Sequence, residues 1–236
     1  AGLGAVLALA LLAGWMAVRN ADLAQISAAR ELQSRRLAAF MLGDLADQLR
    51  PIGKLDVLAS IGEQGLRLLA DGVPGESPAD TLQRAKSLVV IGEVNSSRGK
   101  GRTELALAAL QEARRLLLPL ESSTRLRPAD YYPTLGASAF WIGQIAYDAG
   151  DLAAAAQAMA QYRDACERWQ RAAPQDPDAR TELGFALNSL GSIAMRRGAW
   201  SEAGQWLERS LALKLAALAL RPGDTETLDA VASSRT

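Results

Sequence analysis

The sequence feature that most constrains the fold is an internal repeat with a period of 48 residues. The stretch that begins at Phe140, FWIGQIAYDAGDLAAAAQAM, aligns without a gap to the stretch that begins at Asn188, NSLGSIAMRRGAWSEAGQWL. Four landmark pairs coincide at this shift: Gly143 with Gly191, Gly150 with Gly198, Ala155 with Ala203, and Pro174 with Pro222. Because each copy of such a repeat buries its apolar surface only against its neighbours, the period predicts a solenoid of stacked units.

Each landmark has a physical role in a pair of helices. Gly143 and Gly191 fall midway along the first helix, where the lack of a side chain lets the second helix approach closely. Gly150 and Gly198 supply the left-handed conformation that ends many helices. The alanines complete the crossing, and the prolines end the second helix. We expect first helices near 134–149 and 179–197, and long second helices near 151–172 and 200–220.

A third copy lies upstream, in VVIGEVNSSRGKGRTELALAAL. Gly92 and Gly99 keep the seven-residue spacing, Ala106 takes the place of the small residue, and Pro128 closes the unit. This copy predicts helices near 82–98 and 103–120. The repeat array therefore covers residues 77–236, with units at about 77–130, 131–176 and 177–223 and a truncated fourth unit from residue 224.

Composition indicates a protein made of helices alone. Alanine and leucine dominate, and aromatic residues make up only 5% of the chain. No long stretch alternates apolar with polar residues, as a half-buried strand would. We expect the all-α class, with no sheet.

Residues 1–18 form a predicted transmembrane helix, because AGLGAVLALALLAGWMAV contains no charged residue. As a helix it would be about 27 Å long, close to the hydrocarbon thickness of roughly 30 Å. Trp15 and Arg19 are the aromatic and cationic residues typical of a headgroup edge. A signal-peptide core and a buried helix of a soluble domain are the alternatives; the lack of a cleavage pattern after residue 18 favours the membrane helix.

Residues 19–76 are predicted to form stalk and juxtamembrane helices between the membrane and the array. Apolar residues from Leu23 to Leu49 recur at three- and four-residue spacings, as one helix face requires. Arg50-Pro51 ends this helix, and a second one follows with a buried stripe formed by Ile52, Leu55, Leu58, Ile61, Leu66 and Leu69. Ser77 is then placed to cap the first helix of the array, with Pro78 at its first position and Asp80 three residues after the cap.

The landmark spacing resembles the tetratricopeptide repeat. That pattern of a small residue, a turn glycine, an alanine and a late proline is matched by Gly143, Gly150, Ala155 and Pro174, and again one period later. The family unit has about 34 residues, so this chain resembles an extended variant, and the family's aromatic fourth position is here Leu88, Ala139 or Leu187. The resemblance implies an α-α superhelix whose first helices line a groove that receives a protein or peptide.

Carried over position by position, the resemblance assigns partner-binding residues to three first helices. They are Lys86, Val89, Glu93, Ser96 and Ser97, then Ala137, Phe140, Gln144, Tyr147 and Asp148, and finally Phe185, Asn188, Ser192, Met195 and Arg196. This mixture of aromatic, amide and oppositely charged side chains suits a protein partner or self-association. The alternative is a merely solvated face.

Chemistry within these residues is hard to build. The chain has no histidine, a single cysteine at Cys166 and a formal net charge of zero, which gives no electrostatic case for nucleic acid as a partner. The basic turn at 97–103 lacks the first glycine and the final Ser or Thr of a phosphate-binding loop. We therefore predict no catalytic residue, no cofactor and no metal site, and expect Cys166 to be a buried small hydrophobe.

The expected function is a membrane-anchored scaffold that docks a protein partner. The stretch from Asp44 to Leu69, DLADQLRPIGKLDVLASIGEQGLRLL, resembles the juxtamembrane segment of bacterial membrane-anchored signalling proteins. That resemblance implies an alternative: a sensor or regulatory region behind an upstream serine/threonine kinase or Toll/interleukin-receptor-type domain. We expect a single-pass protein of the bacterial inner membrane. Family resemblance favours a periplasmic array, whereas Arg19, Arg30, Arg35 and Arg36 hint at the cytoplasmic side.

Overall fold

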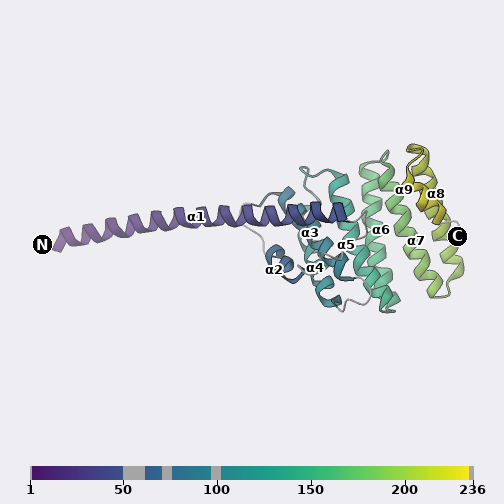
Figure 1. The fold of residues 1–236 in the computed structure, drawn as a ribbon, viewed down its shortest axis with the longest axis horizontal. Helices are drawn as coiled ribbons and strands as arrows, with labels where there is room; N and C mark the ends of the chain where they lie inside the picture. The colour runs from purple at the N-terminus through teal and green to yellow at the C-terminus, as the bar shows by residue number, and fades with distance from the viewer. Residues whose placement is uncertain (1, 50–61, 71–75, 97–101, 234–236) are drawn as a thin grey trace.

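The computed structural model describes residues 2–49, 62–70, 76–96 and 102–233. Every regular element in these ranges is a helix, and none is a strand. The predicted all-α class is thus confirmed. Figure 1 shows one long N-terminal helix that projects from a stack of shorter helices.

The long helix, α1, spans Gly2–Leu49 without a break. At about 1.5 Å per residue its 48 residues extend over roughly 70 Å. It ends directly before Arg50-Pro51, where the sequence predicts a break. Its C-terminal part lies beside the array and packs on α3, Pro78–Ser96, whereas its N-terminal part projects away (Figure 1).

In the parts of the chain that the structure describes, we find no helix with both the length and the apolar character needed to cross a membrane. The predicted transmembrane helix covers residues 1–18. The side chains of residues 1–13, which make up most of it, are not among those that the structure describes. This assignment stays a prediction.

The short helix α2 leads into the array. It covers Gly62–Ala70 and buries Leu69, while the earlier part of the second predicted juxtamembrane helix lies outside the described residues.

The predicted N-terminal cap of α3 is confirmed. The Ser77 amide and hydroxyl donate to Asp80 Oδ2 at 3.2 and 2.7 Å, and the Asp80 amide donates to Ser77 Oγ at 3.2 Å. Together they satisfy amide groups that the first turn of a helix otherwise leaves without partners.

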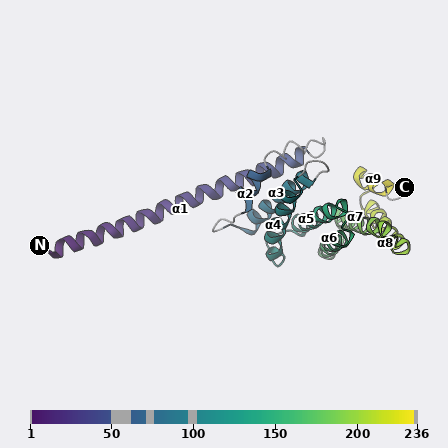
Figure 2. The same ribbon diagram turned by 90° about the horizontal axis from the view of Figure 1, so that it is seen from below.

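The rest of the array consists of helix pairs that stack side by side. After α3 come α4 (Thr103–Leu117), the short 3-10 helix η2 (Leu118–Leu120), α5 (Pro128–Asp148), α6 (Leu152–Ala172), α7 (Pro177–Arg196), α8 (Trp200–Leu220) and α9 (Thr225–Ser233). Each first helix packs most extensively on the second helix that follows it. In Figure 2, α3, α5 and α7 form one layer, and α4, α6 and α8 form the other.

The start of α5 differs from the prediction of a helix near 134–149. Pro128 opens α5 instead of closing the preceding unit, and the extended Arg127 precedes it. Proline is well suited to the first helical position, because its fixed φ is helical and its missing amide needs no partner there. The added turn is held by Tyr131, which is buried and donates its hydroxyl to the Leu117 carbonyl at 3.1 Å.

The repeat period is reproduced in backbone geometry at the turns. Gly150 and Gly198, which end α5 and α7, have φ of +83° and +73°. In both turns the amide after the glycine donates to the carbonyl five residues earlier at 2.9 Å, from Asp151 to Ala146 and from Ala199 to Ala194. This is the Schellman motif, in which a left-handed residue turns the chain back while satisfying the last carbonyls of the helix.

The glycines at the predicted helix crossings are in close contact with the second helix of each pair. A Cβ atom on Gly191 would lie 2.9 Å from Leu207 Cδ2, and one on Gly92 would lie 2.4 Å from Leu110 Cγ. Gly143 is equally confined, with its nearest neighbouring atom at 2.9 Å. At each crossing a Cβ would therefore force a side chain of the second helix to shift.

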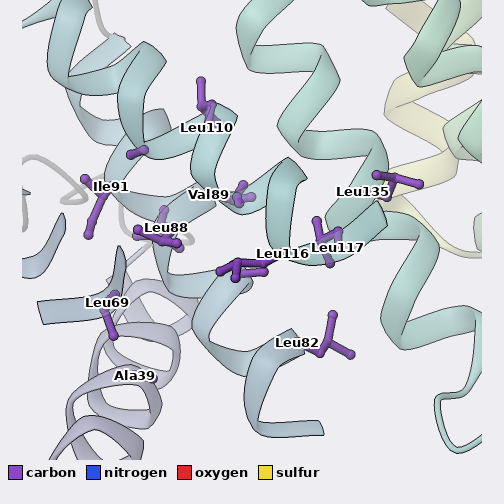
Figure 3. Packing of buried hydrophobic residues seen from close by; sticks show 14 of the residues in the cluster. Ala39, Leu69, Leu82, Leu88, Val89, Ile91, Leu110, Leu116, Leu117 and Leu135 are labelled. Atoms are coloured by element: carbon purple, nitrogen blue, oxygen red, sulfur yellow. The ribbon is translucent and has the colours of Figure 1, made fainter. Parts of the chain in front are cut away.

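Buried hydrophobic residues form two clusters along the stack. The first lies where α1 and α2 meet α3, α4 and α5, and Figure 3 shows Ala39, Leu69 and Leu88 approaching one another there. The second lies between α5, α6 and α7 and includes Met159 and Leu187. The apolar core is thus distributed along the array, as expected when each unit packs on its neighbours.

We predict that Gly191→Leu destabilises the array by about 1–3 kcal/mol, because the new side chain would force α7 and α8 apart. Gly204→Leu on α8, the helix that Gly191 contacts, is the matched control, since a Cβ there meets no atom within 4 Å. The control replaces a partly exposed helical glycine and should leave stability unchanged or slightly higher. Urea unfolding monitored by circular dichroism gives both values, and equal destabilisation by the two variants would contradict the crossing role of Gly191.

Candidate partner-binding groove

The predicted groove residues lie on α3, α5 and α7, which are neighbours in the stack. Ten are partly exposed: Lys86, Glu93, Ser96, Ala137, Phe140, Gln144, Tyr147, Phe185, Asn188 and Ser192. Three more are exposed: Asp148, Met195 and Arg196. Ser97 lies outside the described residues. The face is thus accessible along most of its length.

Val89 is the exception. Its side chain is only 6% exposed and belongs to the first hydrophobic cluster. The physical reason is that α3 packs against α1, α4 and α5 at once, so most of its surface is covered. The assignment of Val89 to the partner-binding groove is therefore corrected: it is a core residue.

A pocket of about 430 Å³ lies within the groove, between the second and third helix pairs. Its walls come from α5, α6 and α7: Ala137, Phe140, Tyr162, Glu182, Phe185, Asn188 and Ser189. Four of the predicted groove residues are brought together here: Ala137, Phe140, Phe185 and Asn188. Lys86, Glu93, Gln144, Tyr147, Asp148, Ser192, Met195 and Arg196 are not among the residues that line it.

The polar wall of the pocket is a hydrogen bond between Tyr162 of α6 and Glu182 of α7. The Tyr162 hydroxyl donates to Glu182 Oε2. Burial raises the pKa of the Tyr162 hydroxyl well above its ordinary value, and the Glu182 carboxylate raises it further. The hydroxyl therefore stays protonated and remains a donor, which holds the carboxylate in one orientation.

The aromatic wall of the pocket is fixed by ring contacts. Phe140 meets Tyr162 edge to face, with ring centroids 5.7 Å apart and an interplanar angle of 64°. Phe140 also meets Trp141 edge to face at 5.0 Å. Edge-to-face pairs stabilise ring positions beyond the burial of apolar area. The Phe140 ring is thus held in place before any partner arrives.

Farther along the groove, Tyr147 and Arg196 join the second unit to the third. Arg196 Nη1 donates to the Tyr147 carbonyl at 2.9 Å, and its guanidinium carbon lies 4.4 Å from the centre of the Tyr147 ring. On the same helix as Tyr147, Gln144 donates to Asp148 Oδ1 at 3.0 Å. These polar side chains form an ordered rim beside the pocket.

Lys214 of α8 lies behind the pocket. Its side chain is 1% exposed, and its Nζ lies 4.5 Å from the centre of the Phe185 ring. Desolvation lowers the pKa of this amine. The aliphatic stem packs against Gly184, where a Cβ would lie 2.9 Å from Lys214 Cγ. Phe185 is therefore supported from within the array by a buried lysine.

Tyr162, Glu182 and Lys214 are the residues at this site that sequence reasoning missed. The period did contain a signal, because Gly136 and Gly184 are also 48 residues apart and mark a second close crossing in each pair. A Cβ on Gly136 would lie 3.0 Å from the Tyr162 ring. Following these glycines to their partners on the second helices would have pointed to Tyr162 and Lys214.

Cys166 is buried beside the pocket, as predicted. Burial raises the pKa of its thiol well above the ordinary value, and the charge of Glu182 raises it further. The thiol is therefore protonated at neutral pH and packs as a small apolar group.

The fold and groove define an all-α protein of stacked helix pairs with a long N-terminal helix. No family model, no curated protein and no solved structure matches this chain.

We predict an energetic coupling of about 0.5–1 kcal/mol between Tyr147 and Arg196, the value typical of exposed cation–π pairs. Tyr147→Leu, Arg196→Met and the double variant complete a double-mutant cycle in urea unfolding. The carbonyl of residue 147, which accepts from Arg196, is a backbone group and remains when Tyr147 is replaced by leucine. The cycle therefore isolates the contact between the ring and the guanidinium. Strictly additive losses would show that the ring and the guanidinium do not interact in solution.

The pH dependence of stability should report Lys214. Because its pKa is lowered in the folded state, the unfolded chain binds more protons between that value and 10.5, and stability rises with pH over this range. Lys214→Met removes this contribution while retaining an apolar stem. We expect the unfolding free energy of the wild type, minus that of Lys214→Met, to increase toward pH 10.5. A difference that is flat with pH would contradict burial of the charged amine.

Proposed function

We propose that this protein is a membrane-anchored scaffold that docks a protein or peptide partner in the groove between α5 and α7. The observation that carries the proposal is the pocket of about 430 Å³, which unites two phenyl rings, a carboxylate and an amide on the face that the repeat register selects. Pockets of this size with mostly apolar walls and a few polar groups are typical binding sites.

The resemblance to tetratricopeptide repeats supports the choice of face. In that family the first helices line the groove, and Phe140, Phe185 and Asn188 occupy the corresponding positions here. Aromatic residues at the centre and charged residues toward the rim are also the usual arrangement of protein interfaces. Arg196 and Asp148 lie toward that rim.

The membrane anchor is supported by the sequence of residues 1–18, which contains no charge. Where side chains begin to be described, Trp15, Met16 and Val18 are 57%, 51% and 63% exposed. Arg19 lies over the Trp15 ring, with its guanidinium carbon 5.0 Å from the ring centre. An aromatic residue and a cation at the end of an apolar helix suit the headgroup region. We propose the bacterial inner membrane, with a periplasmic array.

A second candidate function is a sensor region for a catalytic domain that precedes residue 1. The observation that favours it is the continuity of α1, which runs unbroken from Gly2 to Leu49. Near its end, Ser87 of α3 donates to the Ala39 carbonyl at 2.7 Å. A rigid helix attached to the array in this way would move with it when a partner binds.

The groove is tested by site-specific photo-crosslinking in membranes of the source organism. We predict that a benzoylphenylalanine in place of Ser192, a partly exposed groove residue outside the pocket, forms one adduct of defined mass, whereas the same residue in place of Glu208 forms none. Glu208 is an exposed residue of α8, in the layer opposite the groove. Adducts from both positions, or from Glu208 alone, would contradict docking in the groove.

The same membranes provide the control for the anchor. The intact protein should resist alkaline carbonate extraction, whereas a chain that begins at residue 20 should be released into the supernatant. Release of both forms would contradict the transmembrane helix without bearing on the groove.

A further inference from the structure

We infer that the pocket between α5 and α7 receives a lysine or arginine side chain of the docked partner. The inference rests on the proposed function, and it specifies the chemistry of the segment that binds. It assigns separate roles to Glu182 and Phe140.

The charge of the pocket wall favours a basic side chain. Of the residues that line the pocket, Glu182 is the one with a formal charge. Its carboxylate accepts a hydrogen bond from the Tyr162 hydroxyl at the wall of the pocket. An acidic partner side chain would be repelled here. A purely apolar one would remove water from the carboxylate without replacing it, which is costly.

The rings provide the second argument. Phe140 and Phe185 stand on neighbouring helices and both line the pocket. Long basic side chains pack their methylene stems on apolar surface while keeping the charged end near polar groups. A cation near an aromatic face also gains energy from the ring itself. A pocket with two rings and one carboxylate therefore complements both parts of lysine or arginine.

The position of Lys214 determines which phenyl ring contacts the partner's cation. Its Nζ already lies 4.5 Å from the centre of the Phe185 ring. A second cation is therefore better placed on Phe140, whose ring is fixed by Tyr162 and Trp141. In this arrangement Phe185 packs on the stem, Phe140 contacts the charged end and Glu182 pairs with it. Asn188 offers an amide donor and acceptor at the same wall.

The test is a selection of random twelve-residue peptides displayed on phage against the full chain in detergent micelles. We expect the enriched peptides to share one arginine or lysine at a fixed position. Their affinity, measured by fluorescence anisotropy, should fall at least about tenfold for Glu182→Gln, because a charged hydrogen-bonded pair is lost. Glu208→Gln removes an exposed carboxylate in the opposite layer and should bind like the wild type.

Replacing the shared arginine of the peptide by citrulline completes a cycle. The citrulline peptide should bind the wild type about as weakly as the arginine peptide binds Glu182→Gln. In Glu182→Gln, the two peptides should bind with nearly the same affinity. Glutamine can still accept from the Tyr162 hydroxyl, so Glu182→Gln should melt like the wild type. If it does not, Tyr162→Phe with the citrulline peptide gives an independent reading, because a carboxylate that the hydroxyl no longer orients should reduce the citrulline effect.

Asn188→Trp, which places a large ring on the pocket wall, separates the inference from the proposed function. If this variant loses the peptides while Glu182→Gln keeps them, or if the peptides lack a shared basic residue, the cation assignment is wrong and the groove stands. If the peptides bind Asn188→Trp as well as the wild type, or if none is enriched, the groove itself is not the docking site and both proposals fail.

Discussion

The close crossing of the two helices in each pair is the contact on which the rest of the array depends. At Gly92, Gly143 and Gly191 a Cβ would lie within 2.4–2.9 Å of an atom of the second helix. Such contact fixes the separation of the helices, because close-packed interiors do not deform gradually. Once the pairs are set, the glycine turns return the chain to begin each second helix, and the first helices fall into one layer. The candidate groove lies on this layer of first helices.

A second crossing explains why the pocket occurs at one place in a repeating structure. Gly136 is close to Tyr162 and Cys166, a large residue and a small one. One period later Ser210 stands in place of Tyr162, and Lys214 in place of Cys166. Gly184 is close to Lys214 and to the backbone of Ser210, so the large and the small residue have exchanged positions. Tyr162 therefore reaches across to Glu182 of the next pair and builds the polar wall. Ser210, at the equivalent position, instead donates to the Gly184 carbonyl at 2.7 Å within its own pair.

Sequence reasoning succeeded where local chemistry decides structure. The bounds of α6 and α8 and the cap of α3 follow from glycine, proline and capping residues, whose backbone preferences hold in most settings. Proline is the informative failure, since it suits both the end of one helix and the first turn of the next. Pro128 was assigned to the first role, but it takes the second, because Tyr131 finds a buried partner in α4.

The repeat register predicts only some of the residues of the candidate groove. Phe140, Phe185 and Asn188 follow from the register, because they lie on first helices at equivalent positions. Tyr162 lies on a second helix, and Glu182 precedes the family's groove positions, so the register assigns neither a role. Val89 fails for a different reason, since its burial depends on α3 being packed on three sides, including by a helix outside the repeat.

The N-terminal helices determine which part of the first-helix layer is open. Arg84 of α3 is buried and donates to both oxygens of Glu76 at 3.0 and 2.8 Å, and to the Leu69 carbonyl at the end of α2 at 2.7 Å. Removing one partner of a buried, hydrogen-bonded charge pair is strongly destabilising, so this junction resists opening. Helix α1 also packs on α3, so the first helix pair is covered on that side. The predicted groove residues of α3 include the buried Val89, whereas those of α5 and α7 are all at least partly exposed. The rings, the carboxylate and the amide converge between these two helices.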